Sequence, residues 1–280
     1  MWRFRELEKI TKYVLRSYGI RLKKKLSQHF VVDEDLVNEI LHHTAKFQPL
    51  RVVEVGTGLG ILTAGLGSVA KYVVTIELDQ SLAKVASVYL SREVGDGIID
   101  ILIGDGISLI RSGLREADVL VSNVPYSITG PLINSIIKSN CRVAVLTLQK
   151  EVAERLAAQP GSKSYSRLTV MVNTFMDVEL GGLYPPESFV PHPEVYSRVV
   201  ILKRLRMWDC RWESYEHLIK CLFNQKRKLI KKVLRCCLNE DLTNEFNLGI
   251  APLIEGKRVY QLPAETFLKI YSILYSENLT

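Results

Sequence analysis

A glycine-rich turn between an apolar stretch and a helical pattern constrains the fold more than any other feature of this 280-residue chain. Residues 51–55 predict a buried strand, residues 56–60 (GTGLG) a tight turn and residues 61–69 a helix. Glycines at such a turn let a ligand approach the backbone and the helix N-terminus. The next strand, 72–76, ends at Glu77, about twenty residues beyond the glycines, where an acidic side chain can bind both hydroxyls of a ribose. The spacing is G-x-G-x-G rather than G-x-G-x-x-G, so a dinucleotide site is the weaker interpretation.

Strands and helices continue to alternate beyond this unit. We expect helices near residues 3–18, 33–45, 131–138, 150–158 and 208–237, and strands near 98–103, 118–122, 142–148, 168–175 and 197–203. The alternation predicts an α/β fold with a doubly wound parallel sheet. Asp105 follows one of these strands, where it is either a turn residue or an acceptor for the adenine amino group of a cofactor.

The tetrapeptide Asn123-Val124-Pro125-Tyr126 directly follows the strand expected at 118–122. Pro125 cannot continue a strand ladder, and ligands bind at the carboxyl ends of strands in open α/β sheets. The Asn123 oxygen and a backbone carbonyl freed at Pro125 can accept hydrogen bonds from an exocyclic amino group, and the Tyr126 ring can stack on a base. The four residues therefore predict a site for an amino-bearing base, with an ordinary strand-ending turn as the alternative.

The net charge of +7 is unevenly distributed along the chain. Residues 1–26 carry a net charge of +7 and residues 204–280 carry +4, whereas residues 27–203 carry −4. Cations at both ends predict contact with a polyanion, and a solvated basic surface is the alternative. The residues expected to contact RNA phosphates are Lys23, Lys24, Lys25, Lys226, Arg227, Lys228, Lys231 and Lys232. If the C-terminal cations, at positions 226–232, lie on a helix, its apolar residues are expected to face inward, namely Leu229, Ile230, Val233 and Leu234.

Five cysteines without a C-x-x-C pair favour reduced thiols in a cytosol, with no structural zinc or other metal site. No apolar run approaches the length needed to span a bilayer, and the charged N-terminus is no secretory signal. We therefore expect a cytoplasmic protein without membrane contact.

Several motifs together resemble the rRNA adenine N6-dimethyltransferases. The motifs appear in the family's order: Gln28-His29-Phe30, 54–60 (EVGTGLG), 76–79 (IELD), Gly104-Asp105, Asn123-Val124-Pro125-Tyr126, 149–155 (QKEVAER), 160–168 (PGSKSYSRL) and 189–195 (FVPHPEV). At position 29 the chain has His, where bacterial members usually have Asn. In this respect it resembles archaeal or eukaryotic-type members.

The resemblance implies a Rossmann-like, S-adenosylmethionine-dependent methyltransferase domain at 27–203, a basic N-terminal extension at 1–26 and a small all-helical, RNA-contacting domain at 204–280. It assigns the cofactor to Gln28, His29, Val31, Gly56, Gly58, Glu77, Asp105 and Asn123. The catalytic residues by the same resemblance are Asn123, Pro125, Tyr126 and Phe189, with Tyr126 and Phe189 on either side of the target adenine; the alternative for Phe189 is a plain core aromatic. The chain departs from the family at Thr57 (commonly Pro), Gly106 (Ala), Ser127 (Asn) and Glu194 (Lys), and the last removes a positive charge near the target pocket.

The implied reaction is dimethylation of N6 on two adjacent adenosines in the 3′-terminal hairpin loop of small-subunit rRNA. The expected partner is this RNA within a pre-30S/40S-type particle, bound by a monomer with a role in small-subunit biogenesis. Two alternatives remain: a large-subunit adenine methyltransferase of the antibiotic-resistance type, and a non-catalytic assembly or transcription factor on the same fold. Residues 160–168 favour the small-subunit enzyme over the resistance type. A nicotinamide dehydrogenase is a distant further possibility.

Overall fold

The computed structural model describes residues 4–23, 28–112, 117–238 and 249–275. The chain divides into two compact units, one of Met1–Ala153 with Glu179–Arg204 and one of Glu154–Val178 with Leu205–Thr280. The second unit therefore takes in a segment, Glu154–Val178, that the sequence boundaries assign to the methyltransferase domain. Those boundaries stay a prediction.

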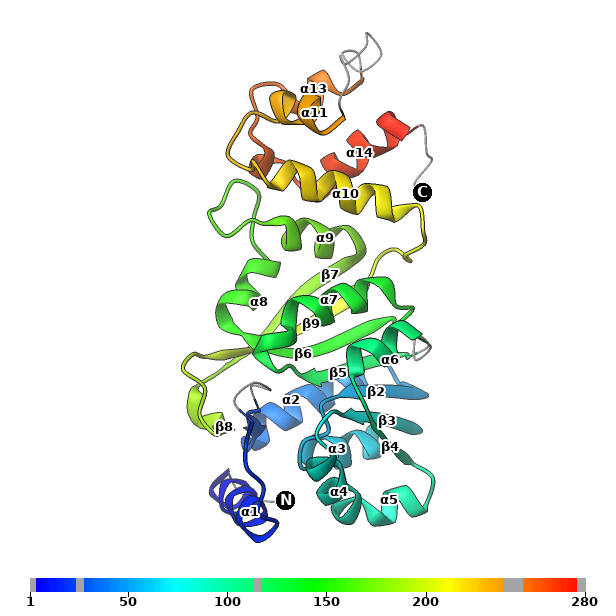
Figure 1. Cartoon of the computed structure of the whole chain (residues 1–280), viewed down its shortest axis with the longest axis vertical. Coiled ribbons are helices and arrows are strands. Elements are labelled where there is room, and N and C mark those ends of the chain that lie inside the picture. Colours follow the sequence, from blue (N-terminus) through cyan, green and yellow to red (C-terminus); the bar gives the residue numbers. More distant parts are fainter. Residues whose placement is uncertain (1–3, 24–27, 113–116, 239–248, 276–280) are drawn as a thin grey trace. The chain divides into compact units, whose positions relative to one another are not determined.

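The first unit is organised around a seven-stranded sheet with the order β4-β3-β2-β5-β6-β9-β7 (Figure 1). The strands are β2 Arg51–Val55, β3 Tyr72–Glu77, β4 Ile99–Ile103, β5 Val119–Asn123, β6 Val143–Gln149, β7 Met176–Tyr184 and β9 Ser197–Arg204. Neighbours from β4 to β6 pair in parallel, as predicted, whereas β9 pairs antiparallel with β6. The α/β class is confirmed, with a mixed rather than wholly parallel sheet.

Helices cover both faces of this sheet. Val52 and Val53 are consecutive on β2 and point to opposite faces, yet both are fully buried. The helices of the unit are α1 Phe4–Ser17, α2 Glu34–Ala45, α3 Ile61–Val69, α4 Gln80–Tyr89, α5 Ser91–Gly95, α6 Gly106–Ser112 and α7 Thr129–Lys138. The sequence boundary between the units falls within α8, Lys150–Leu156. Asp33 caps α2 as expected, because its carboxylate accepts hydrogen bonds from the backbone N–H groups of Asp35 and Leu36.

The strand predicted near 168–175 is wrong, because this segment is helix α9, Arg167–Phe175. Its run of β-branched residues favours a strand, but Ser166 and Thr169 form a reciprocal capping box that starts a helix instead. Val170, Val172 and Phe175 on this helix are fully buried. Tertiary packing therefore overrides the local strand preference, and the strand follows as β7.

The second unit is largely helical, as expected. Besides α9 it contains α10 Trp212–Phe223, α11 Ile230–Leu238, α13 Ala251–Ile254, the 3₁₀ turn η4 Val259–Gln261 and α14 Ala264–Tyr275. Tyr215 lies at the centre, fully buried between Trp212 and Tyr271, and its hydroxyl pairs with Thr174 Oγ1 over 2.9 Å. A polar group that is hydrogen-bonded in this way can be buried without a large desolvation cost.

The expectation of five reduced cysteines is wrong for two of them, because Cys221 and Cys237 form a disulfide between α10 and α11. The pairing needs two helices to meet across a turn, and a separation of 16 residues alone does not reveal this. Cys141, Cys210 and Cys236 carry free thiols. Within the described ranges, no helix has the length and hydropathy that a bilayer crossing requires.

Candidate active site

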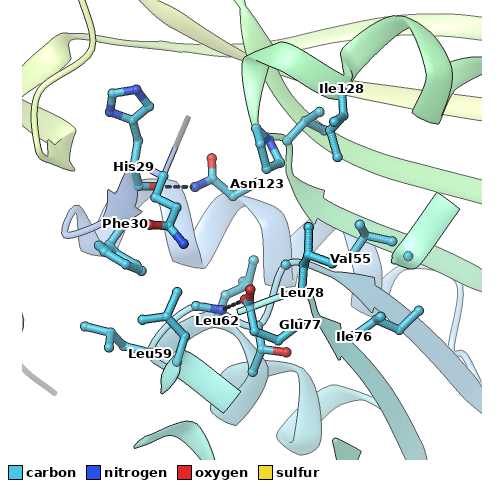
Figure 2. Close-up of a pocket in the computed structure, with 18 of the residues that line it drawn as sticks. His29, Phe30, Val55, Leu59, Leu62, Ile76, Glu77, Leu78, Asn123 and Ile128 are labelled. Carbon is cyan, nitrogen blue, oxygen red and sulfur yellow. Dashed lines mark hydrogen bonds between the residues drawn. The ribbon is translucent and has the colours of Figure 1, made fainter. Parts of the chain in front are cut away.

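A pocket of about 180 Å³ lies at the carboxyl ends of the central parallel strands (Figure 2). All eight residues predicted to bind the cofactor line it, namely Gln28, His29, Val31, Gly56, Gly58, Glu77, Asp105 and Asn123. Pro125 and Tyr126 line it too. Segments that are far apart in the sequence thus meet at one position, the place where open α/β sheets bind ligands.

Three successive residues of β3 hold the glycine turn. Thr75 Oγ1 pairs with Thr57 Oγ1 over 2.6 Å, and the Ile76 carbonyl accepts from Gly56 N over 2.8 Å. The third contact runs from Gly58 N to Glu77 Oε2 over 2.9 Å. Gly56 and Gly58 have left-handed φ angles of 93° and 57°, which residues with a Cβ rarely adopt. The space beside Gly56 is open, so the turn can accept a ligand against its backbone.

Glu77 lies at the end of β3 with only 6% of its surface exposed. Oε1 accepts from Asp79 N over 2.9 Å, while Oε2 is held by Gly58. Burial raises the pKa of Glu77, and the backbone N–H groups of Asp79 and Gly58 partly oppose this rise. An ionised carboxylate has about four acceptor positions, so Glu77 retains capacity for two ribose hydroxyls.

Lys23 makes an ion pair with Asp79, with Nζ and Oδ2 2.8 Å apart. Burial acts to raise the pKa of Asp79, but the hydrogen bond from Lys23 and the N–H of Ser81 outweigh it and lower the pKa. Lys23, predicted to contact RNA, is therefore engaged in an ion pair with Asp79, the residue whose backbone N–H donates to Glu77. Lys24 and Lys25 lie outside the described residues.

Asp105 is exposed at the start of α6, where both carboxylate oxygens are used. Oδ1 accepts from Ile107 N over 3.1 Å and Oδ2 from Ser108 Oγ over 2.7 Å. The residue thus acts as a helix cap and also lines the pocket, so the two sequence interpretations are compatible. Gly106 next to it explains one departure from the family, because a Cβ there would lie 2.8 Å from Val55 Cγ1.

Asn123 ends β5 and donates from Nδ2 to the carbonyl of His29 over 2.7 Å (Figure 2). This contact assigns the amide orientation and leaves Oδ1 as the atom that can accept a hydrogen bond from an amino group. The Pro125 carbonyl already accepts from Ile128 N over 3.0 Å. Of the two carbonyls after Asn123, that of Val124 is therefore the better second acceptor.

Tyr126 lies in the short 3₁₀ turn η2, Tyr126–Ile128, and its hydroxyl pairs with Ser197 Oγ over 2.7 Å. The His29 ring lies 5.5 Å from the Tyr126 ring and is tilted by 30°. His29 is itself anchored, because Nδ1 lies 2.7 Å from the carbonyl oxygen of Pro191. Burial raises the pKa of the Tyr126 hydroxyl, so this group stays neutral at physiological pH.

Phe189 does not line the pocket, contrary to the role predicted for it. It belongs to β8, Phe189–Val190, which pairs antiparallel with β1, Phe30–Val31. The side chain is 1% exposed and packs in the hydrophobic core with Leu36 and Ile40. The alternative interpretation, a plain core aromatic, therefore describes this residue in the structure.

The basic residues of the second unit divide into two groups. Lys226 is half-buried, and its Nζ donates to the carbonyls of Tyr165 (2.7 Å) and Lys163 (3.1 Å). Burial and the nearby charge of Arg227 lower the pKa of Lys226. The other predicted RNA contacts in this unit are exposed, namely Arg227 and Lys228 in the turn and Lys231 and Lys232 on α11.

The prediction of which apolar residues face inward behind these cations is only partly correct. Ile230, Val233 and Leu234 are buried, but Leu229 is 41% exposed because α11 begins after it.

Ser197 and Leu78 were missed by sequence reasoning. Ser197 reaches Tyr126 from 71 residues away, and no local pattern signals such a contact. Leu78 is 53% exposed at the pocket and directly follows Glu77, so its position next to a predicted ligand residue was an available signal.

Comparison with known proteins shows the family to which the chain belongs. A sequence profile described as "Ribosomal RNA adenine dimethylase" matches residues 19–276. The "Ribosomal RNA small subunit methyltransferase A" of Thermotoga maritima is 34% identical over 261 residues, which cover 92% of this chain and 87% of that protein.

Two crystal structures are similar over most of the chain. A dimethyladenosine transferase from Plasmodium falciparum has a TM-score of 0.74 at 27% identity and covers 89% of this chain and 98% of its own. The 23S rRNA methyltransferase ErmE has a TM-score of 0.66 at 25% identity and covers 88% and 99%, respectively. This chain therefore belongs to the ribosomal RNA adenine dimethylase family, whose members are S-adenosylmethionine-dependent methyltransferases.

Proposed function

We propose that this chain transfers methyl groups from S-adenosylmethionine to N6 of two adjacent adenosines in the 3′-terminal hairpin loop of small-subunit rRNA. It acts as a cytoplasmic monomer on a pre-30S/40S-type particle and contributes to small-subunit biogenesis. The observation that carries the proposal is the convergence of the amide of Asn123 and the carboxylate of Glu77 on one pocket. A hairpin loop suits the site, because its bases are partly unstacked and cost less to extrude.

The pocket residues fit the cofactor. The open backbone at Gly56 and the carboxylate of Glu77 suit its ribose side, and the exposed apolar side chain of Leu78 suits an adenine ring. When bound, the cofactor supplies a methyl group on a sulfonium that is already activated for transfer. The protein therefore has to bind, orient and shield the reacting atoms rather than create a strong electrophile.

The chemical task of Asn123 is to activate a poor nucleophile. The N6 lone pair of adenine is delocalised into the ring, so the amino group is nearly planar. Acceptors at Asn123 Oδ1 and the Val124 carbonyl can bind the two N6 hydrogens and favour tetrahedral geometry, which localises the lone pair toward the methyl group. No strong base is required, because the amine becomes acidic once methylated and loses its proton to water.

Stacking of the target base is assigned to Tyr126 alone. Its hydroxyl is held by Ser197, so the ring is fixed in orientation. The centroids of the His29 and Tyr126 rings are 5.5 Å apart, a distance typical of two rings in direct contact, so a base does not fit between them. The target base therefore stacks on the other face of Tyr126 or replaces His29.

The resistance-type alternative shares the fold, as the similarity to ErmE indicates. An experiment with labelled S-adenosylmethionine separates the two. Unmethylated small-subunit particles and large-subunit RNA are offered to the enzyme in the same reaction. Label in the small-subunit RNA supports the proposal, and label only in the large-subunit RNA would replace it with the resistance-type activity. Label in neither RNA, with cofactor bound, would favour an assembly factor.

A further inference from the structure

A carboxyl group is buried directly behind the glycine turn. Glu54 lies on β2 with no exposed surface, and Oε2 accepts hydrogen bonds from Thr63 Oγ1 and Thr75 Oγ1, each over 2.6 Å. Oε1 is buried and has no hydrogen-bond partner among the described residues. Burying a carboxyl group of which only one oxygen is hydrogen-bonded costs folding free energy. The methyl transfer described above does not use this group.

A chain of hydroxyls connects this carboxyl to the cofactor pocket. Thr75 donates its proton to Glu54, so its oxygen is left to accept from Thr57 Oγ1 over 2.6 Å. Thr57 lines the pocket within the glycine turn. The family that this chain resembles commonly has proline at this position, which has no hydroxyl. The connection from the turn to Glu54 therefore depends on a residue by which this chain departs from its family.

The surroundings of Glu54 place its titration near neutrality. Burial raises its pKa to about 7, the hydroxyls of Thr63 and Thr75 act to lower it, and the carboxylate of Glu77 on β3 acts to raise it. Among the described residues, the hydroxyl partner Thr63 on α3 and the register partner Val121 on β5 are both uncharged. Contacts of 2.6 Å are typical of hydroxyls that donate to an ionised carboxylate.

We propose that Glu54 is a positioning residue for the cofactor: its ionised carboxylate orients the hydroxyls of Thr75 and Thr57 and thereby holds the glycine turn in the form that binds S-adenosylmethionine. When Glu54 gains a proton, the carboxyl becomes a weaker acceptor for two hydroxyls, and the turn loses part of this support. Cofactor binding therefore favours ionised Glu54 and releases a proton to solvent. The inference rests on the cofactor and not on the RNA target proposed above.

Titration calorimetry of the full chain with S-adenosylmethionine between pH 6 and pH 8 tests this inference. Buffers with different ionisation enthalpies report the number of protons released. We expect the wild-type affinity to rise with pH by at most roughly tenfold per unit, the limit for one linked proton. Glu54→Gln keeps an acceptor but cannot ionise, so its affinity should be less dependent on pH.

Thr57→Val tests the role of the hydroxyl chain separately from the role of the Glu54 charge. It preserves side-chain size and leaves both Glu54 and Glu77 intact, yet it should remove the same pH dependence. Thr44→Val is the matched control, because Thr44 is a buried threonine on α2 whose hydroxyl donates to the Ile40 carbonyl and not to Glu54 or the glycine turn. It should keep the wild-type profile. A thermal melt establishes that each variant is folded.

Three results would overturn the inference. The first is a wild-type affinity that does not change with pH and involves no proton release. The second is a wild-type profile in folded Glu54→Gln and Thr57→Val, which would assign the proton to another group such as Glu77. The third is loss of the profile in Thr44→Val, a general effect of removing a buried hydroxyl. Failure of RNA methylation with a normal binding profile would contradict only the proposed function.

Discussion

The backbone N–H of Gly58 donates to Glu77 Oε2 over 2.9 Å, so the glycine turn and the acidic residue after β3 form one hydrogen-bonded unit. Glu77→Ala should weaken S-adenosylmethionine binding, because it removes the proposed ribose acceptor and this support of the turn. Loss of hydrogen bonds to a charged group costs about 1.5–3 kcal/mol, or roughly 10- to 150-fold in affinity. Calorimetry measures the change, with the exposed Asp96→Ala as a control that should bind normally. Unchanged affinity in a folded Glu77→Ala protein would remove Glu77 from the cofactor site.

Tyr126 allows stacking to be separated from hydrogen bonding. Tyr126→Phe keeps the ring and loses only the contact with Ser197, so it should retain much of the methyl transfer activity. Tyr126→Ala should lose roughly 1–3 kcal/mol of base stacking, measured as a fall in kcat/KM for RNA. Equal losses in the two variants would mean that the hydroxyl, and not the ring, is the important group. Ser197→Ala offers a matched test of the hydroxyl contact from the other side.

The basic residues of the second unit should differ in their effects. Arg227→Ala with Lys228→Ala should weaken RNA binding and reduce its salt dependence by roughly one unit of slope per lost phosphate contact. Lys226→Met should instead lower the stability of this unit, because it removes hydrogen bonds to the carbonyls of Lys163 and Tyr165. RNA binding is measured over a range of salt concentrations, and stability by thermal melting. A slope that stays constant in the double variant would identify these two residues as a solvated surface.

Strand ends were the part of the site that the sequence could predict. Glu77 and Asn123 each follow an apolar run, and a parallel sheet brings such positions to one edge. Contacts that depend on distant pairing could not be predicted. In the sequence, Phe189 lies in a proline-rich stretch and is expected to be available to stack on a base. Only the pairing of β8 with β1 shows that it lies in the core. Likewise, Glu54 reads as an ordinary strand residue until Thr63 and Thr75 converge on it.

Glu54 should also affect stability in a pH-dependent manner. Its pKa is about 7 in the folded protein and 4.5 by the reference value for the unfolded chain, so the folded state binds the proton more tightly. Protonated Glu54 therefore adds to the free energy of unfolding, and this contribution is fully present below pH 4.5. About 3 kcal/mol is lost as the pH rises toward about 7. Urea unfolding of wild type and Glu54→Gln at pH 5 and pH 8 measures the difference. The stability difference between the two proteins should change with pH, and a constant difference would mean that Glu54 does not titrate in this range.

The central claim is that Asn123 activates an adenine N6 within small-subunit rRNA. The most direct measurement is mass spectrometry of the 3′-terminal hairpin of this RNA after reaction of unmethylated particles with wild-type enzyme and Asn123→Ala. The wild type should produce N6,N6-dimethyladenosine at two adjacent positions. Asn123→Ala should produce none while calorimetry still detects cofactor binding. Dimethyladenosine at wild-type levels in the Asn123→Ala reaction, or its absence from this hairpin with the wild type, would contradict the claim.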